Sequence, residues 1–287
     1  AGLSTDDLPD LLEMLEDFDG LWRLSDKLAQ GFAHQHVLLA AVERAIRHLP
    51  ALSDASGAPL LDAGRARYLG VSLGAIYGPI LVASSPDLDT GVMHVPSAMF
   101  ASLFQHSAEF KLLQQIVDGL HKDPRAQQGI YALAQRALDP IDPINWTARL
   151  IAEPLLPERA KQMLWQVSWG DTNAPDFGAY ALQRSAAIPL VTPSTHPVFE
   201  VGATLAAPSP AGSTGLVIFD AQKEAPALTT AEVADNGAHH ALRCLDEVRQ
   251  QTAAFFAQGS EGTIVSPCPD ALCVVEGIDC RTTVGGL

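Results

Sequence analysis

The sequence predicts an α/β fold built on a mostly parallel sheet. Segments typical of buried strands alternate with segments typical of amphipathic helices along the 287 residues, and such alternation favours parallel strands joined by helices. A short buried strand over 66–71 runs through a tight turn directly into a helix over 75–84. Hydrophobic residues make up 47% of the chain, which is enough for a sizeable core.

The part of the chain before this strand predicts helices. Apolar residues recur at steps of three and four between residues 6 and 49. The first apolar stripe comprises Leu8, Leu11, Leu12, Leu15 and Phe18, and the second comprises Val37, Leu38, Ala41, Val42, Ala45, Ile46 and Leu49. A loop rich in Gly, Ser and Asp follows over 53–64, and no strand is predicted in residues 1–65.

The rest of the chain alternates strands with helices, apart from one helical stretch. Further strands are expected at 90–95, 161–168 and 215–219, and further helices at 177–186 and 242–258. Residues 100–160 instead carry helical patterns over 100–116 and 127–138, which we interpret as a cap inserted between strands. We therefore expect one partial domain over 1–287, a helical cap at 100–160 and a cysteine-bearing tail at 259–287.

Charge and hydropathy exclude two kinds of partner. The chain has 18 basic and 33 acidic residues and a net charge of −15, which repels nucleic acid and anionic lipid surfaces. No apolar run reaches eighteen residues, so no membrane span is expected. The chain opens at Ala1 without a signal peptide, which we interpret as a mature or truncated start.

The four cysteines are Cys244, Cys268, Cys273 and Cys280. The close pair Cys268 and Cys273 lies in a Pro/Gly-rich tail and suits a small disulfide, and Cys244 could reach Cys280. The alternative is a metal site, but zinc usually takes two close ligand pairs, and here there is one, with no histidine near it. We favour disulfides, which imply an oxidising compartment, periplasmic or extracellular.

The turn after the 66–71 strand has the sequence Gly70-Val71-Ser72-Leu73-Gly74. A strand that ends in Gly-x-Ser-x-Gly and enters a helix is typical of the nucleophile elbow of serine hydrolases. We expect glycine at 70 and 74 because side chains there would collide with the neighbouring strand and helix. The alternative interpretation is an ordinary glycine-containing turn.

A serine nucleophile needs a base and an acid that orients the base. In α/β hydrolases these follow the serine in the order acid, then histidine. Asp171 lies just after the 161–168 strand, and His239 lies in the loop after the 215–219 strand, before the last helix. The sequence thus predicts Ser72 as nucleophile, Asp171 as orienting acid and His239 as base.

Each partner has a competitor. Asp171 could instead be a turn aspartate that binds local N–H groups, and Asp176 lies nearby, where it could cap the following helix. His240 adjoins His239 but is expected in the first turn of the last helix. The other seven histidines have no comparable context.

At this point the chain resembles bacterial secreted α/β-hydrolase lipases and esterases. The segments that carry the resemblance are Asp6-Asp7, Gln30-Gly31, 68–78, Val92-Met93-His94-Val95-Pro96, 107–110, Asp142-Pro143, Asn236-Gly237-Ala238-His239 and Pro267-Cys268-Pro269-Asp270. The resemblance implies an α/β-hydrolase fold and hydrolysis of a small-molecule or lipid ester through an acyl-enzyme. The Phe and Leu content of the cap favours an acyl or aromatic ester.

One departure from that family concerns the oxyanion hole. Four strands precede the elbow in this fold, and a His-Gly or Gly-Gly-Gly stretch supplies one oxyanion N–H while the residue after the nucleophile, here Leu73, supplies the other. Neither feature is found before Ser72. We therefore expect the carboxyl-terminal part of a larger hydrolase, weakly active alone, whose partner is the missing amino-terminal segment or a self-association partner.

Two other functions stay open: an amidase or peptidase of the same fold, and a non-catalytic hydrolase-like binding module. No cofactor is expected. No metal is expected either, because the acidic turn with Asp87 and Asp89 offers two carboxylates, whereas calcium takes six to eight oxygens.

Overall fold

The chain is described from a computed structural model. The described residues are 20–62, 66–199, 202–223, 234–257, 259, 261–268, 270 and 272–274. The first predicted stripe, from Leu8 to Phe18, lies outside these residues, as does Cys280.

The described residues form a six-stranded sheet in the order β1-β2-β3-β6-β4-β5, and the neighbouring strands pair in parallel. The strands are β1 (Arg67–Val71), β2 (Thr90–His94), β3 (Gln162–Ser168), β4 (Leu190–Thr192), β5 (Thr204–Ala206) and β6 (Gly215–Phe219). The chain is therefore an α/β protein with a mostly parallel sheet, as predicted.

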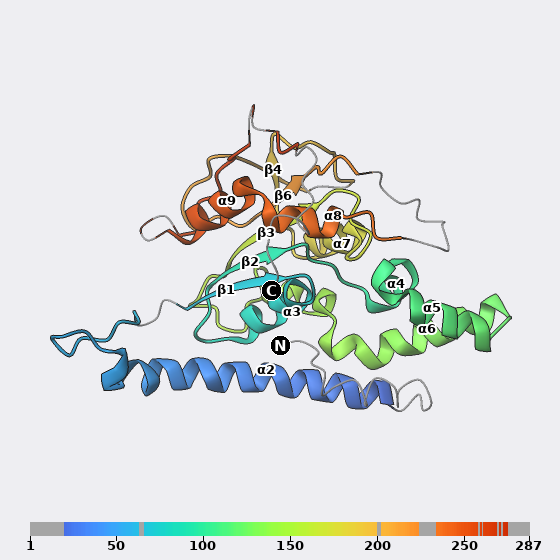
Figure 1. Ribbon diagram of the computed structural model, residues 1–287, viewed down its shortest axis with the longest axis horizontal. Coiled ribbons are helices and arrows are strands. Elements are labelled where there is room, and N and C mark those ends of the chain that lie inside the picture. The colour runs from blue at the N-terminus through green and yellow to red at the C-terminus, as the bar shows by residue number, and fades with distance from the viewer. Residues whose placement is uncertain are drawn as a thin grey trace.

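Helices connect β1 to β2, β2 to β3 and β3 to β4, and helices cover both faces of the sheet (Figure 1). They are α2 (Gly20–Arg44), α3 (Leu73–Ser84), α4 (Phe100–His106), α5 (Lys111–Leu120), α6 (Pro124–Leu138), α7 (Asp176–Ser185), α8 (Ala238–Ala241) and α9 (Asp246–Phe256). The long α2 runs along one side of the molecule in Figure 1 and packs against α6. No helix among the described residues is long and apolar enough to cross a membrane.

Alternate residues of the buried strands point to opposite faces and build separate cores. On β3, Met163 and Trp165 join a buried cluster with residues of α3 and α7. Leu164, between them, joins a cluster with residues of α9 on the other face. All five residues of β2 and six of the seven residues of β3 are buried, because both faces of the sheet are covered at these strands.

The first strand lies at an edge of the sheet. Among the described residues it pairs only with β2. Leu69 and Val71, on its α9 face, are 55% and 38% exposed. On the other face Tyr68 packs against the cluster around α3. The face of β1 that carries Tyr68 is thus covered, whereas the face that carries Leu69 and Val71 is partly exposed to solvent.

Three local predictions differ from the structure. The 25-residue helix α2 ends at Arg44, before the last three members of the second apolar stripe, and short 3₁₀ turns follow at Ile46–His48 and Pro50–Leu52. The strands β4 and β5 were not predicted from the sequence, because with three residues each they are too short to show a period. The final helix expected at 242–258 begins only at Asp246, because a 3₁₀ turn at Leu242–Cys244 separates α9 from the short helix α8 before it.

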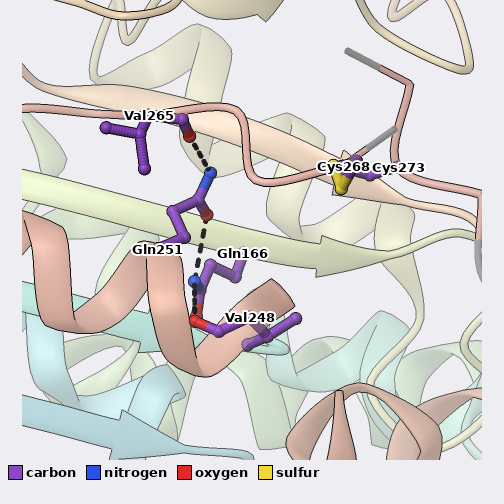
Figure 2. The surroundings of a disulfide bond; sticks show 6 residues. All are labelled: Gln166, Val248, Gln251, Val265, Cys268 and Cys273. Atoms are coloured by element: carbon purple, nitrogen blue, oxygen red, sulfur yellow. Dashed lines mark hydrogen bonds between the residues drawn. A yellow bond between two sulfur atoms is a disulfide. The ribbon is translucent and has the colours of Figure 1, made fainter. Parts of the chain in front are cut away.

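The described part of the cysteine-bearing tail lies beside the end of β6. Cys268 and Cys273 form a disulfide, and the carbonyl of Cys273 accepts a hydrogen bond from the N–H of Asp220. Cys244 is also disulfide-bonded; its predicted partner lies outside the described residues. Figure 2 shows Gln251 between Gln166 and the carbonyl of Val265, in the segment that leads to the disulfide.

Candidate active site

The turn between β1 and α3 holds Ser72 in a strained conformation. Its φ is 55° and its ψ is −120°, a region that residues other than glycine seldom adopt. Its N–H donates to the carbonyl of His94 on β2, and its carbonyl accepts from the N–H groups of Ala75 and Ile76. The strain is therefore maintained by the neighbouring strand and by the first turn of α3.

Of the two elbow glycines, only Gly70 is required by space. A Cβ at Gly70 would lie 2.4 Å from the carbonyl oxygen of Gly74, a backbone atom that cannot move aside. A Cβ at Gly74 would meet nothing closer than the Tyr68 hydroxyl at 3.6 Å, which is ordinary contact. The expectation that both glycines avoid collisions is thus right for Gly70 and wrong for Gly74.

The three predicted residues meet at the carboxyl ends of their strands. The Nε2 of His239 lies 2.8 Å from the Oγ of Ser72, and its Nδ1 lies 2.7 Å from the Oδ2 of Asp171. Because an ionised carboxylate only accepts hydrogen bonds, Nδ1 carries the proton and Nε2 is left to accept from the serine hydroxyl. The arrangement has the polarity of a serine hydrolase triad.

Asp171 is held by its own loop. Its Oδ1 accepts hydrogen bonds from the N–H groups of Asn173 and Ala174 at 2.8 and 2.9 Å, and the residue is 2% exposed. Its turn contacts match the alternative interpretation as well, so the same carboxylate closes a turn with one oxygen and holds the base with the other.

The competitor Asp176 is the first residue of α7 and binds the loop that contains Asp171 without contacting His239. Its Oδ2 accepts from the N–H of Gly170 at 3.2 Å and from the hydroxyl of Tyr180 at 3.4 Å. Burial, and then the charge of Asp171, raise the pKa of Asp176 above its usual value. The carboxylate that contacts His239 is that of Asp171.

The base lies on the short helix α8, which begins after Gly237 turns the chain with a φ of +81°. His239 is 3% exposed, whereas the half-buried His240 is on the outer side, where its Nδ1 contacts Arg243. Both histidines belong to α8, so the expectation that His240 begins the last long helix is wrong. The preference for His239 agrees with its contacts to Ser72 and Asp171.

The loop around Asp171 also contacts the helices of the 100–160 stretch. The N–H of Ala108 donates to the carbonyl of Thr172 at 2.8 Å, and the hydroxyl of Ser107 donates to the carbonyl of Asn173 at 2.5 Å. The amide of Asn173 donates to Glu109 at 2.8 Å. The junction between α4 and α5 is therefore fixed to the acid loop.

A buried histidine adjoins Ser72, whose N–H donates to the carbonyl of this histidine, His94. His94 ends β2 and is 3% exposed; its Nδ1 contacts Gln166 Oε1 at 3.2 Å, and its Nε2 has no partner among the described residues. Burial lowers the pKa of His94 to about 4, with smaller contributions from His239 and Arg243. An imidazole expected to have no special context is thus kept neutral next to the site.

Two further predictions concern Leu73, as an oxyanion donor, and Asp89, as part of an acidic turn. Leu73 is the first residue of α3, so its N–H has no acceptor within the helix and can point to a ligand. Asp89 directly precedes β2, at the amino end of that strand, and forms ion pairs with Arg159 and Lys161. No group of three or more His, Cys, Asp or Glu among the described residues could hold a metal ion.

No family model matches this chain, and no curated protein or solved structure matches it. The function proposed below therefore depends on the contacts and distances within the site.

No role in the site was predicted from the sequence for several residues that surround it. They are His94, Ser107, Glu109, Gln166, Ser168, Thr172, Asn173 and Asn236. Thr172 and Asn173 directly follow Asp171, and Asn236 precedes His239 by three residues, so their nearness to the triad was a usable signal. Ser107 and Glu109 lie in the 107–110 segment that carries the family resemblance, but only the fold brings them to the acid loop.

Proposed function

We propose that this protein is a serine carboxylic ester hydrolase of the α/β-hydrolase kind, with Ser72 as nucleophile, His239 as base and Asp171 as the acid that orients it. The observation that carries the proposal is the pair of hydrogen bonds through His239, 2.8 Å to Ser72 and 2.7 Å to Asp171. The strained φ of Ser72 supports it, because backbone strain of this kind clusters at functional sites.

In the proposed reaction, Ser72 Oγ attacks the ester carbonyl carbon while His239 Nε2 takes the hydroxyl proton. His239 then gives that proton to the departing alkoxide as the carbon–oxygen bond to the alcohol breaks, which leaves an acyl group on Ser72. A water molecule repeats the attack, with His239 again as base. The acid product leaves, and Ser72 regains its proton. Asp171 stays ionised and stabilises the imidazolium.

The negative charge that develops on the carbonyl oxygen needs N–H donors. We assign one of them to Leu73, because it follows the nucleophile and begins α3. We assign no second donor to the described residues. Removing one oxyanion donor typically lowers turnover by about 10²–10³-fold, so we expect slow turnover from residues 1–287.

Two further features, the aromatic side chains near the elbow and the disulfide, favour a class of substrate and a compartment. The helices of the 100–160 stretch contribute Phe100, Phe104 and Phe110 to a chain of ring contacts beside the elbow, which favours an apolar acyl or aromatic ester. The disulfide between Cys268 and Cys273 favours an oxidising compartment, extracellular or periplasmic.

The test compares hydrolysis of a short p-nitrophenyl ester with that of the matching p-nitroanilide. We expect slow release of p-nitrophenol that Ser72→Ala abolishes, and much slower release of p-nitroaniline. Preferential cleavage of the anilide would favour an amidase. A folded wild-type chain that gives the same rate as Ser72→Ala on both substrates would contradict the proposal and favour a binding module.

A further inference from the structure

The acid lies in the loop after β3, and the base lies at the start of α8, directly after a second loop. The two residues are 68 positions apart in sequence, and one hydrogen bond, from His239 Nδ1 to Asp171, joins them directly. A reacting group that is misplaced by about 1 Å can lose about 10²-fold in rate. The spacing between the two loops therefore has to be maintained by further contacts.

Asn236 makes such contacts on both sides of Asp171. Its side-chain Nδ2 donates to the carbonyl of Gly170, the residue before the acid, at 2.8 Å. Its backbone N–H donates to the hydroxyl of Thr172, the residue after the acid, at 3.1 Å. Both neighbours of Asp171 are thus bonded to one residue of the other loop.

The same side chain also sets the start of α8. The Oδ1 of Asn236 accepts from the N–H of Ala238, the residue before His239, at 3.1 Å, and lies 3.2 Å from the Thr172 hydroxyl. These partners fix the amide orientation, because a carbonyl can only accept and a backbone N–H can only donate. A carboxamide meets both requirements, whereas a carboxylate meets one.

A second contact joins the same two segments without Asn236. The hydroxyl of Ser168, the last residue of β3, donates to the carbonyl of Ala238 at 2.9 Å. Because this contact anchors α8 to the sheet, losing the Asn236 side chain leaves the helix in place and affects chiefly the spacing between the loops.

We propose that Asn236 is a positioning residue for the triad, which sets the distance and direction between Asp171 and His239. This inference rests on the proposed function as far as rate is concerned. Its geometric part, that Asn236 maintains the hydrogen bond from His239 to Asp171, is independent of activity.

The test uses two readouts on the full chain. The first is the low-field proton resonance of the His239 Nδ1–H in its hydrogen bond to Asp171, assigned with His239→Ala. The second is the rate at which a fluorophosphonate labels Ser72. In Asn236→Ala we expect the resonance to be lost or broadened by exchange, and labelling to slow by about 10²-fold, with an unchanged circular dichroism spectrum.

Two further variants sharpen the result. Asn236→Asp keeps the acceptor for Ala238 but puts an oxygen against the Gly170 carbonyl, so it should fail like alanine. Thr172→Val removes the hydroxyl that contacts the N–H and the Oδ1 of Asn236 but keeps the shape and the bond from Asn236 to Gly170. It should therefore give a smaller loss, and it serves if both Asn236 variants fail to fold. Asn145→Ala is the matched control, because the Asn145 side chain also donates to a backbone carbonyl, that of Asp139, but lies exposed and away from the site.

Folded Asn236 variants with the wild-type resonance and labelling within twofold would overturn the inference, as would an unchanged Thr172→Val if it alone folds. A wild-type chain that shows the resonance but does not label would refute the proposed function instead. Asn236 would then be judged on the resonance alone, which Asn236→Ala must still remove.

Discussion

Ser72 stands between two flanks of the sheet that are covered to very different degrees. On one flank, Asp171 and His239 are 2% and 3% exposed, and hydrogen bonds join their loops to each other and to the junction of α4 and α5. On the other flank, β1 is an edge strand among the described residues, and Leu69 on it is 55% exposed.

The difference separates the two requirements of the proposed chemistry. Proton transfer depends on the covered flank, whose serine, base and acid are all in place. Stabilisation of the oxyanion depends on the other side of Ser72, where Leu73 is the one donor that we assign. Changes on the covered flank should therefore alter reactivity or stability strongly, whereas changes on the outer face of β1 should alter little.

The largest contrast is expected between the two adjacent histidines. His239→Ala removes the base and should lower ester hydrolysis and fluorophosphonate labelling by at least about 10³-fold. His240→Ala should keep the rate within about threefold, because His240 takes no part in the two hydrogen bonds that join Ser72, His239 and Asp171. Its half-buried side chain contacts Arg243 and the edge of the His239 ring. Initial rates of labelling would measure both. The opposite ranking would show that the base is misassigned.

The two elbow glycines should differ next most. Gly70→Ala places a methyl group against the Gly74 carbonyl, and such overpacking should cost about 1–3 kcal/mol or more in free energy of unfolding. Gly74→Ala has room and lies in the first turn of α3, so it should be neutral or stabilise by up to about 1 kcal/mol. Urea unfolding of both variants provides the comparison, and equal costs would mean that the elbow packs differently.

The buried His94 predicts a dependence of stability on pH. Burial lowers the pKa of His94 from its usual 6.5 to about 4 in the folded chain, so the unfolded chain binds more protons between these values. Its contribution to stability is therefore complete above about pH 6.5 and is lost as the pH falls through about 4. Between pH 7 and pH 5 the loss from this group is about 2 kcal/mol.

His94→Asn cannot titrate in this range and should abolish that part of the loss. Urea midpoints of the wild type and the variant at pH 7 and pH 5 measure the difference. The same pH dependence in both proteins would assign the effect to other groups.

The smallest effect is expected on the outer face of β1. Leu69→Ala should change the free energy of unfolding by less than about 0.5 kcal/mol, because the side chain is more than half exposed. Leu164→Ala is the matched control from the same face of β3, fully buried, and should cost about 2–5 kcal/mol. A cost above about 1.5 kcal/mol for Leu69→Ala would show that this face is covered.

Much of this molecule was predictable from local sequence, because its longer elements have a clear period and its triad residues follow strands. The strands β1, β2, β3 and β6 and the helices α3 and α7 lie within one or two residues of their predicted bounds. The placement of β6 between β3 and β4 was not predictable, because strand order depends on contacts distant in sequence.

The candidate site shows the same division. The order and loop positions of Ser72, Asp171 and His239 were enough to select them over Asp176 and His240. The contacts of Glu109 with Asn173 and of Asn236 with Gly170 join segments more than sixty residues apart. Polar residues of these types are common in loops for local reasons, so only the fold distinguishes the ones that support the triad.

The most direct test of the central claim is fluorophosphonate labelling of the folded chain followed by peptide mass mapping. We predict one phosphonyl group on the peptide that contains Ser72, added slowly to the wild type and not at all to Ser72→Ala or to the urea-unfolded chain. A folded wild-type chain that stays unlabelled after prolonged exposure, or labelling that persists in Ser72→Ala, would contradict it.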